Sequence, residues 1–466
     1  MRITKYWWVG LVVVIIGTNL TCDLTRKASF NKIAGQLPQA EADAMRLGLP
    51  LSGAELVRNP PVKPEDNAWP LLKDAITALK SASKPNENWR TIATNALIDL
   101  DAASLAQANA QMEKLDPALD LAIRASTKPD IDLGRKWATT NPVTLAHQEL
   151  DEIKQLVTAL GLRGALRSQR GNTQGAVADF RASLLIAGLV SKEPTAIDAM
   201  VRIALESLAF RAMEAAATFA PRNTEFLKSL DQLAADQAAN PMDFDNTLRA
   251  EVWSGVFLAA RSPKEIAADL QVAASRDGNT NMIEGYILEE RMKADGISSE
   301  LLARAYRSYA LQAWVEFFDA KVPQETRLQR FERFEKWAEK NSSSRASVAN
   351  LNEYLFLPYR RMGRTFARNE ARPAAFRGLM AALLYRAKNG KFPTTLADAG
   401  FEGRDYFTTE PLKYIVEGDT VKVYSVDFDR RDDQGTEPVA GSHDPNAPRD
   451  IVVAFPRQIR SSRIEK

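Results

Sequence analysis

Cysteine and histidine are almost missing from this 466-residue chain. The single cysteine, Cys22, excludes an intrachain disulfide and a zinc site built from several cysteines. The two histidines are His147 and His443, so a histidine-dependent catalytic arrangement would have to use one of them. His147 precedes Asp151 by about one helical turn, a spacing that fits metal ligation but is more typical of a solvated helix face. His443 lies in a loop rich in Gly, Ser and Pro, with no candidate nucleophile beside it.

An excess of either charge is also absent. The 61 Lys and Arg residues nearly cancel the 59 Asp and Glu residues, and the basic residues form no stripe. This balance argues against nucleic acid as a partner. Hydrophobic residues make up 45% of the chain and charged residues 26%, which is typical of a globular protein with a proper core.

The longest stretch without charge is the N-terminal segment, residues 6–22. Its centre reads VGLVVVIIG, two tryptophans stand at its start, and Arg2 and Lys5 precede it. A helix of this length spans about 25 Å, enough for a short membrane crossing. The pattern predicts an uncleaved signal anchor in residues 1–27, a single pass through the cell membrane, and an extracytoplasmic location for the bulk of the chain. A cleaved signal peptide, a lipoprotein modified at Cys22 and a buried core helix are the alternatives.

Apolar residues at three-four spacing dominate the region from 28 to 345. One stripe consists of Val143, Ala146, Leu150, Ile153, Val157 and Leu160. Prolines and glycines separate such runs, and no sustained alternation typical of strands occurs before residue 410. We therefore predict an irregular helical array over 28–345, followed by a linking helix region over 346–372.

One pair of predicted helices resembles a tetratricopeptide (TPR) hairpin. Gly164 stands where two helices could approach closely, and the small-aromatic-small pattern of the second TPR helix is met by Ala176, Phe180 and Ser183. Arg163 and Arg167 depart from that pattern, and no second copy follows at the TPR period. The segment fits either a TPR-like hairpin inside an irregular array or two ordinary packed helices.

An aromatic-rich pair of helices is expected further along the chain, with Trp314, Phe317, Phe318, Phe331, Phe334 and Trp337 at helical spacing. Such spacing favours packing inside a core. A groove that binds a peptide is the alternative.

In the C-terminal module, residues 373–466, the spacing of apolar residues changes from the helical period to the alternation typical of strands. A helix is predicted over 373–388 and ends at Gly390. Two alternating segments then flank the turn 417–419, and a third strand is expected over 451–455. The overall prediction is a mainly α protein that ends in a small α+β module, one helix plus a three-stranded antiparallel meander. We expect the body and the module to build separate cores.

A long acidic loop lies between the second and third predicted strands. Residues 427–450 contain six aspartates and one glutamate. Calcium accepts carboxylates mixed with backbone carbonyls, so a calcium ion could hold such a loop in place. Arg431 breaks the spacing of an EF-hand loop. A solvated acidic loop without any ion is the alternative.

The C-terminal module resembles the type II secretion major pseudopilin. The resemblance rests on NGKFPTTL, EPLKY, YSVDFDRRDDQG and RDIVV. That family binds calcium in the loop between its last strands, and the resemblance implies Asp429 and Asp450 as the first calcium ligands by position. Asp427 is the next candidate, and Asp432 and Asp433 lie in the same region. The chain departs from the family at Tyr406, where the family has proline, and by placing the module about 350 residues after the anchor.

The whole chain resembles a set of uncharacterised membrane-anchored helical proteins familiar from planctomycetes. The shared features are GLPLSGAEL, a Pro-rich connector, and VADFRASLLIAGLVSKEPTAIDAMVRIALESLAFRAM. No established activity comes with this resemblance.

These patterns favour a non-enzymatic envelope protein that contacts other envelope proteins, linked to secretion or pilus-like assembly. No residue is assigned a catalytic role. A hydrolase that acts on envelope polymers through helical carboxylates is the alternative. A deep cleft with two carboxylates in opposed environments would favour the enzyme, and an extended concave surface would favour the binding protein.

Overall fold

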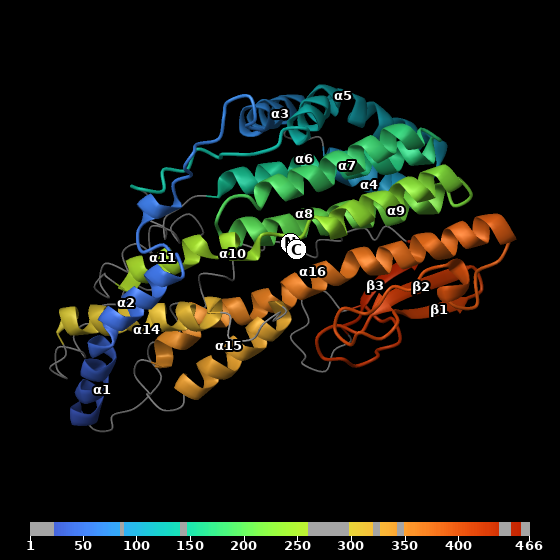
Figure 1. The fold of residues 1–466 in the computed structure, drawn as a ribbon. Coiled ribbons are helices and arrows are strands. Elements are labelled where there is room, and N and C mark those ends of the chain that lie inside the picture. The colour runs from blue at the N-terminus through green and yellow to red at the C-terminus, as the bar shows by residue number, and fades with distance from the viewer. Residues whose placement is uncertain are drawn as a thin grey trace.

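The computed structural model describes residues 23–83, 88–139, 147–259, 298–319, 327–342, 349–437 and 449–457. Helices dominate, and a small antiparallel sheet follows them, which confirms the predicted fold class (Figure 1). Residues 1–22, which include the whole uncharged run of the anchor predicted over 1–27, lie outside the described residues. Within the described part of the chain, no helix combines the length and the apolar character that a membrane crossing needs. The helices are α1 (Asp23–Gly35), α2 (Leu37–Arg46), α3 (Trp69–Ala82), α4 (Trp89–Asp99), α5 (Ala102–Ser126), α6 (Gln148–Gln169), α7 (Thr173–Val190), α8 (Ala196–Phe219), α9 (Thr224–Ala239), α10 (Phe244–Thr247), α11 (Arg249–Ala259), α14 (Ser299–Phe318), α15 (Arg327–Ser342) and α16 (Ala349–Asn389).

Short polar side chains set many of the helix starts. Each accepts a hydrogen bond from a backbone N–H of the first turn, which otherwise has no partner within the helix. These residues are Asn88 for α4, Asp101 for α5, Asn172 for α7, Thr195 for α8, Asn223 for α9, Asp243 for α10 and Ser298 for α14. The caps divide the apolar sequence into helices of defined length that pack side by side.

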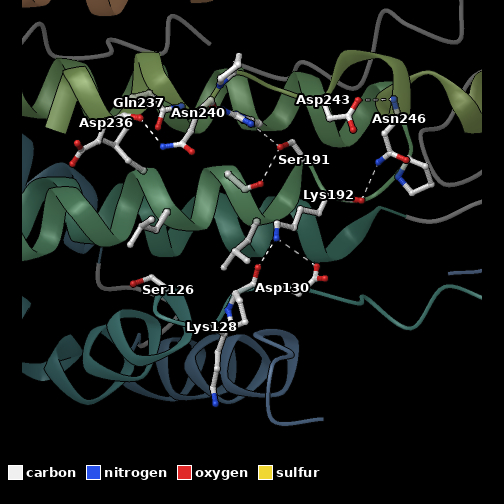
Figure 2. Close-up of a pocket in the computed structure, with 18 of the residues that line it drawn as sticks. Ser126, Lys128, Asp130, Ser191, Lys192, Asp236, Gln237, Asn240, Asp243 and Asn246 are labelled. Atoms are coloured by element: carbon white, nitrogen blue, oxygen red, sulfur yellow. Dashed lines mark hydrogen bonds and ion pairs between the residues drawn. The ribbon is translucent and has the colours of Figure 1, made fainter. Parts of the chain in front are cut away.

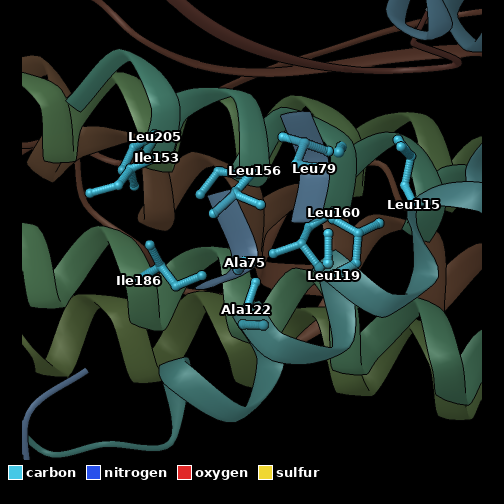
Figure 3. Packing of buried hydrophobic residues seen from close by; sticks show 14 of the residues in the cluster. Ala75, Leu79, Leu115, Leu119, Ala122, Ile153, Leu156, Leu160, Ile186 and Leu205 are labelled. Carbon is cyan, nitrogen blue, oxygen red and sulfur yellow. The ribbon is translucent and has the colours of Figure 1, made fainter. Parts of the chain in front are cut away.

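The first helical layer is held by aliphatic side chains. Figure 3 shows leucines, isoleucines and alanines of α3, α5, α6, α7 and α8 meeting in one cluster. Ile153 and Leu160 of α6 are fully buried there, as the predicted stripe required, whereas Val143 and Ala146 of that stripe lie outside the described residues. Burying one such side chain stabilises the fold by about 1.5–3 kcal/mol.

The α6–α7 hairpin confirms the close approach expected at Gly164. A Cβ atom at this position would lie 2.6 Å from the Phe180 ring of α7, so a larger residue could not fit without displacing that ring. The turn between the two helices uses Gly171 at a φ of +81°. The TPR-like pair is therefore a tightly packed hairpin in the middle of the array.

The aromatic-rich helices α14 and α15 belong to a second core. Phe317 lies 5.4 Å from Phe334 and 5.2 Å from Phe331, measured between ring centroids. Phe317, Phe331 and Phe334 are all buried, together with residues of α1, α2, α10, α11 and α16. These rings pack inside a core, as the helical spacing favoured, and do not line a peptide groove.

The C-terminal sheet confirms the predicted meander. It consists of β1 (Lys413–Glu417), β2 (Thr420–Ser425) and β3 (Ile451–Phe455) in the order β1-β2-β3. Both pairs are antiparallel, with Tyr414 opposite Val423 and Val423 opposite Val453. Gly418, at a φ of +61°, closes the turn between β1 and β2.

The expectation of two separate cores is wrong. One continuous apolar cluster joins α7, α8 and α9 to α16 and the sheet. Phe210 of α8 packs edge-on against Phe376 of α16 at 5.3 Å, and Val453 of β3 is buried in the same cluster. Helix α16 lies between the helical body and the sheet (Figure 1), and it runs without a break through the boundary predicted at residue 373. The spacing of apolar residues predicts the change from helix to strands near the C-terminus. It does not predict that α16 and the sheet pack on α7, α8 and α9.

Candidate functional site

The three predicted calcium ligands each make protein contacts of their own. Asp427 is buried, and its Oδ2 lies 3.0 Å from Nε of Arg368. Oδ2 of Asp450 accepts a hydrogen bond from the backbone N–H of Gly435, and Oδ1 of Asp429 accepts one from Arg431. Among the described residues, no group of three or more His, Cys, Asp or Glu side chains is arranged to hold a metal ion. Residues 438–448 of the acidic loop lie outside that part, so calcium binding stays a prediction.

Burial changes the acidity of two of these groups. It raises the pKa of Asp427 to about 6, although the Arg368 guanidinium opposes the shift. It also raises the pKa of Asp450 to about 6, against the hydrogen bond from Gly435. Both carboxyls therefore titrate well above the usual range for aspartate.

One recess on the helical body is a groove of about 1130 Å³. It is lined by the end of α5, by α7, by the end of α9, by α10 and by the segment 55–58, and Figure 2 shows many of its polar residues. We call this recess the body groove. The helices around it end in the loops 127–131, 191–195 and 240–243, which bring their polar groups to one place.

Apolar side chains from α7 form part of the groove surface. Leu184 and Leu189 are buried, whereas Leu185 is 45% exposed. Val57, which also lines the groove, is 52% exposed. Large exposed side chains of this kind in a recess provide contact area for a ligand.

Hydrogen bonds fix the loops that carry the groove walls. Arg58 donates to Oδ1 of Asp130 at 2.9 Å, to the carbonyl of Ile131 and to the carbonyl of Lys192. Lys192 reaches back to Asp130, as Figure 2 shows. These contacts tie three segments together that are far apart in sequence, so the groove is preformed.

Arg202 of α8 likewise joins two of the loops that border the groove. It donates to Oγ of Ser191 at 3.0 Å and to the carbonyl of Asn240 at 2.8 Å. Its Nε also pairs with Glu206 on the next turn of α8.

The groove carries more positive than negative charge. Its described lining includes six basic residues, Arg58, Lys128, Arg181, Lys192, Arg202 and Arg249, against four acidic ones, Glu55, Asp130, Asp236 and Asp243. Several of the basic side chains already bind protein groups, as described for Arg58, Lys192 and Arg202. Arg181 on α7 is exposed and makes no hydrogen bond or ion pair with the described residues.

The acidic residues of the groove each bind a protein group. Asp130 is ion-paired with Arg58, Asp236 is exposed and accepts a hydrogen bond from Gln232, and Asp243 caps α10. Glu55 accepts hydrogen bonds from the backbone N–H of Leu51 and from Oγ of Ser52.

A buried charge cluster lies directly behind the groove loop 191–195. Arg135 is its centre and is only 4% exposed. Its guanidinium binds both oxygens of Asp198, lies 2.8 Å from Oε1 of Glu149 and lies 3.8 Å from Oε2 of Glu193. His147 stands against the same guanidinium at 3.2 Å, so it is not on a solvated helix face. Burial lowers the pKa of this histidine.

Glu193 in this cluster should make stability depend on pH. Burial raises its pKa from 4.5 to about 7, and Arg135 only partly opposes the shift. The folded protein therefore keeps a proton that the unfolded chain has lost, and stability should fall by up to roughly 3 kcal/mol as pH rises from 4.5 to 7. We expect urea unfolding of Glu193→Gln to show a flatter pH profile over this range. Substituting the exposed Glu65 in the same way should leave the profile unchanged, and equal profiles for wild type and Glu193→Gln would contradict the assignment.

Comparisons with protein-family models, with curated proteins and with solved structures found no match. The functional argument therefore rests on the geometry of the chain itself.

Proposed function

We propose that this protein is a non-enzymatic envelope protein that binds an extended segment of another protein in the body groove. The feature that carries the proposal is the preformed groove, where α7 presents the exposed Leu185 and, one turn away, Arg181, which has no partner among the described residues. The partner segment should combine an apolar side chain with acidic residues.

The geometry supports a peptide better than a small substrate. The groove is open along the ends of several helices, and its walls are fixed by hydrogen bonds before any ligand arrives. A preformed site avoids the cost of ordering loops on binding. Leu185 and Val57 offer apolar contact, and Arg181 offers a charge-assisted hydrogen bond to a carboxylate.

The charge requirement can be tested with displayed peptides. The full-length protein, in detergent, is used to select binders from a library of random peptides, and we expect the selected sequences to be enriched in Asp or Glu near a large apolar residue. Substituting Arg181→Glu should weaken a selected peptide by about tenfold to a hundredfold, because a charged hydrogen bond contributes about 1.5–3 kcal/mol. The matched control is Arg222→Glu, an exposed arginine outside the groove.

Selection of peptides without acidic residues, or equal losses for the two arginine variants, would contradict the proposal. Binding of isolated glycan fragments of the envelope, followed by their cleavage, would instead favour the hydrolase alternative.

The location of the protein is part of the same proposal. The uncharged segment 6–22 supports a single-pass anchor in the cell membrane with the groove on the extracytoplasmic side. We expect the full-length protein to fractionate with membranes, and a variant without residues 1–27 to be released. If Cys22→Ser alone releases the protein, lipidation replaces the signal anchor.

A further inference from the structure

A second, smaller cavity lies where α8, α16 and the C-terminal sheet meet. Its volume is about 260 Å³, and it is separate from the body groove. It is lined by Ile203, Ser207 and Arg211 of α8, Thr365, Arg368, Asn369 and Arg372 of α16, and Glu437, Asp450, Ile451 and Val452 of the C-terminal module. We call it the junction cavity.

Two of its arginines have donors to spare. Arg372 has a 17% exposed side chain, and its one close partner among the described residues is Glu214, at 3.7 Å, too far for a hydrogen bond. Arg211 makes no hydrogen bond or ion pair with the described part of the chain. Arg368 differs, because Asp427 and the carbonyl of Arg449 occupy its guanidinium.

Two acceptors in the same lining lack hydrogen-bond donors among the described residues. Oδ1 of Asp450 is buried and has no donor there, while Oδ2 of this side chain accepts from the backbone N–H of Gly435. Oδ1 of Asn369 is also buried with no donor in the described part of the chain, while its Nδ2 donates to Glu206. Asp450 is 1% exposed and lines the cavity, so a donor bound in the cavity lies close to this side chain. Leaving such a group unpaired costs about 1–3 kcal/mol.

The electrostatic surroundings agree with these unused groups. Burial lowers the pKa of Arg372 and outweighs the opposing effect of the carboxylates Glu214 and Glu437, while Arg211 and Arg457 lower it further. An additional anion beside Arg372 would offset the repulsion among these guanidinium groups. A donor beside Asp450 would supply its missing hydrogen bond.

From these unused donors and acceptors we infer that the junction cavity binds a small zwitterion of the α-amino acid class. Its carboxylate binds Arg211 and Arg372, and its ammonium group binds Asp450 and Asn369. A cavity of this size accommodates one such molecule. The inference does not depend on the body groove, because the two recesses share no lining residue.

Calorimetric titration of the full-length protein with each standard amino acid tests the inference. We expect at least one amino acid to bind. Its analogue without the amine and its amide without the carboxylate should each bind about tenfold to a hundredfold more weakly, because each loses a charged hydrogen bond. No heat with any amino acid at millimolar concentration, or equal binding of the amine-free acid, would overturn the inference.

Variants separate binding from folding. Arg211 is exposed, so Arg211→Met should leave the fold intact while weakening the amino acid by a similar factor. The same substitution should not weaken the amide, which has no carboxylate to lose. Arg222→Met is the control outside the cavity and should bind like wild type. Equal affinities for Arg211→Met and Arg222→Met would overturn the assignment even if an amino acid binds elsewhere.

Discussion

Deleting residues 373–466 is expected to abolish the cooperative unfolding transition of the whole protein. The deletion removes half of a shared core, whose lost members include Phe376, Leu379, Met380, Leu383, Val421, Val423, Val453 and Phe455. Each large side chain contributes about 1.5–3 kcal/mol by burial, and a native protein has only about 5–15 kcal/mol of net stability. The remaining faces of α8 and α9 would be exposed to water, so the product should aggregate. A monomeric 1–372 fragment that melts in one sharp transition would contradict this expectation and would mean that the aliphatic cluster of α3–α8 suffices for folding.

A shorter deletion shows which part of the module matters. Removing residues 391–466 keeps α16 whole and removes the sheet that covers it. Thermal melting and size-exclusion chromatography should show a destabilised, association-prone protein.

Substituting Asp179→Ala is expected to destabilise the protein by about 3–5 kcal/mol, the range for removing one partner of a buried ion pair. Asp179 is fully buried on α7, and its two oxygens bind Arg163 at 2.7 Å and Arg167 at 2.9 Å. Arg163 is itself only 2% exposed. Without Asp179, its guanidinium keeps only the partly exposed Asp116 and Asp120 as partners among the described residues.

Two further variants make this prediction specific. Asp120 is 67% exposed, so Asp120→Ala should cost less than about 1 kcal/mol. The double variant Arg163→Met, Asp179→Leu removes the buried charges together and should recover much of the loss, because apolar replacements of buried ion pairs are often neutral. Urea denaturation provides the free energies of unfolding. Equal costs for Asp179→Ala and Asp120→Ala would contradict a buried pair.

Helices and strands could be predicted from the sequence because they depend on the local spacing of apolar residues. The stripe that ends in Val157 and Leu160 and the alternation around Val421 and Val423 both correspond to elements of the structure. Gly164 was also identified correctly, because a glycine opposite an aromatic residue signals close helix packing. These inferences require no knowledge of which elements meet in space.

Long-range packing was not readable in the same way. Apolar spacing predicts that one face of α16 is buried. It does not predict that α16 packs against both α9 and β3. The available signal for a buried pair was that Arg163 and Asp179 each lie between apolar residues of their helices. In the TPR pattern, the arginine counts only as a departure. The body groove and the junction cavity are assembled from loops and helices far apart in the chain, so neither could be predicted.

The contacts of the predicted calcium ligands also depend on long-range packing. The density of aspartates near residue 430 suggested calcium, yet a count of carboxylates does not show what each one contacts. Asp427 lies against Arg368, and Asp450 holds a backbone N–H while presenting its other oxygen to the junction cavity. The C-terminal module is thus joined to the rest of the chain by ion pairs as well as by apolar packing.

The central claim, protein binding in the body groove, is tested most directly by one pair of substitutions. Leu185 in the groove is 45% exposed and Ile98 on α4, outside the groove, is 40% exposed, so replacing each by aspartate perturbs folding to a similar degree. Affinities of a selected acidic peptide are measured for both variants by calorimetric titration. The proposed function predicts about tenfold or greater weakening for Leu185→Asp and wild-type affinity for Ile98→Asp. Unchanged binding by Leu185→Asp would contradict it.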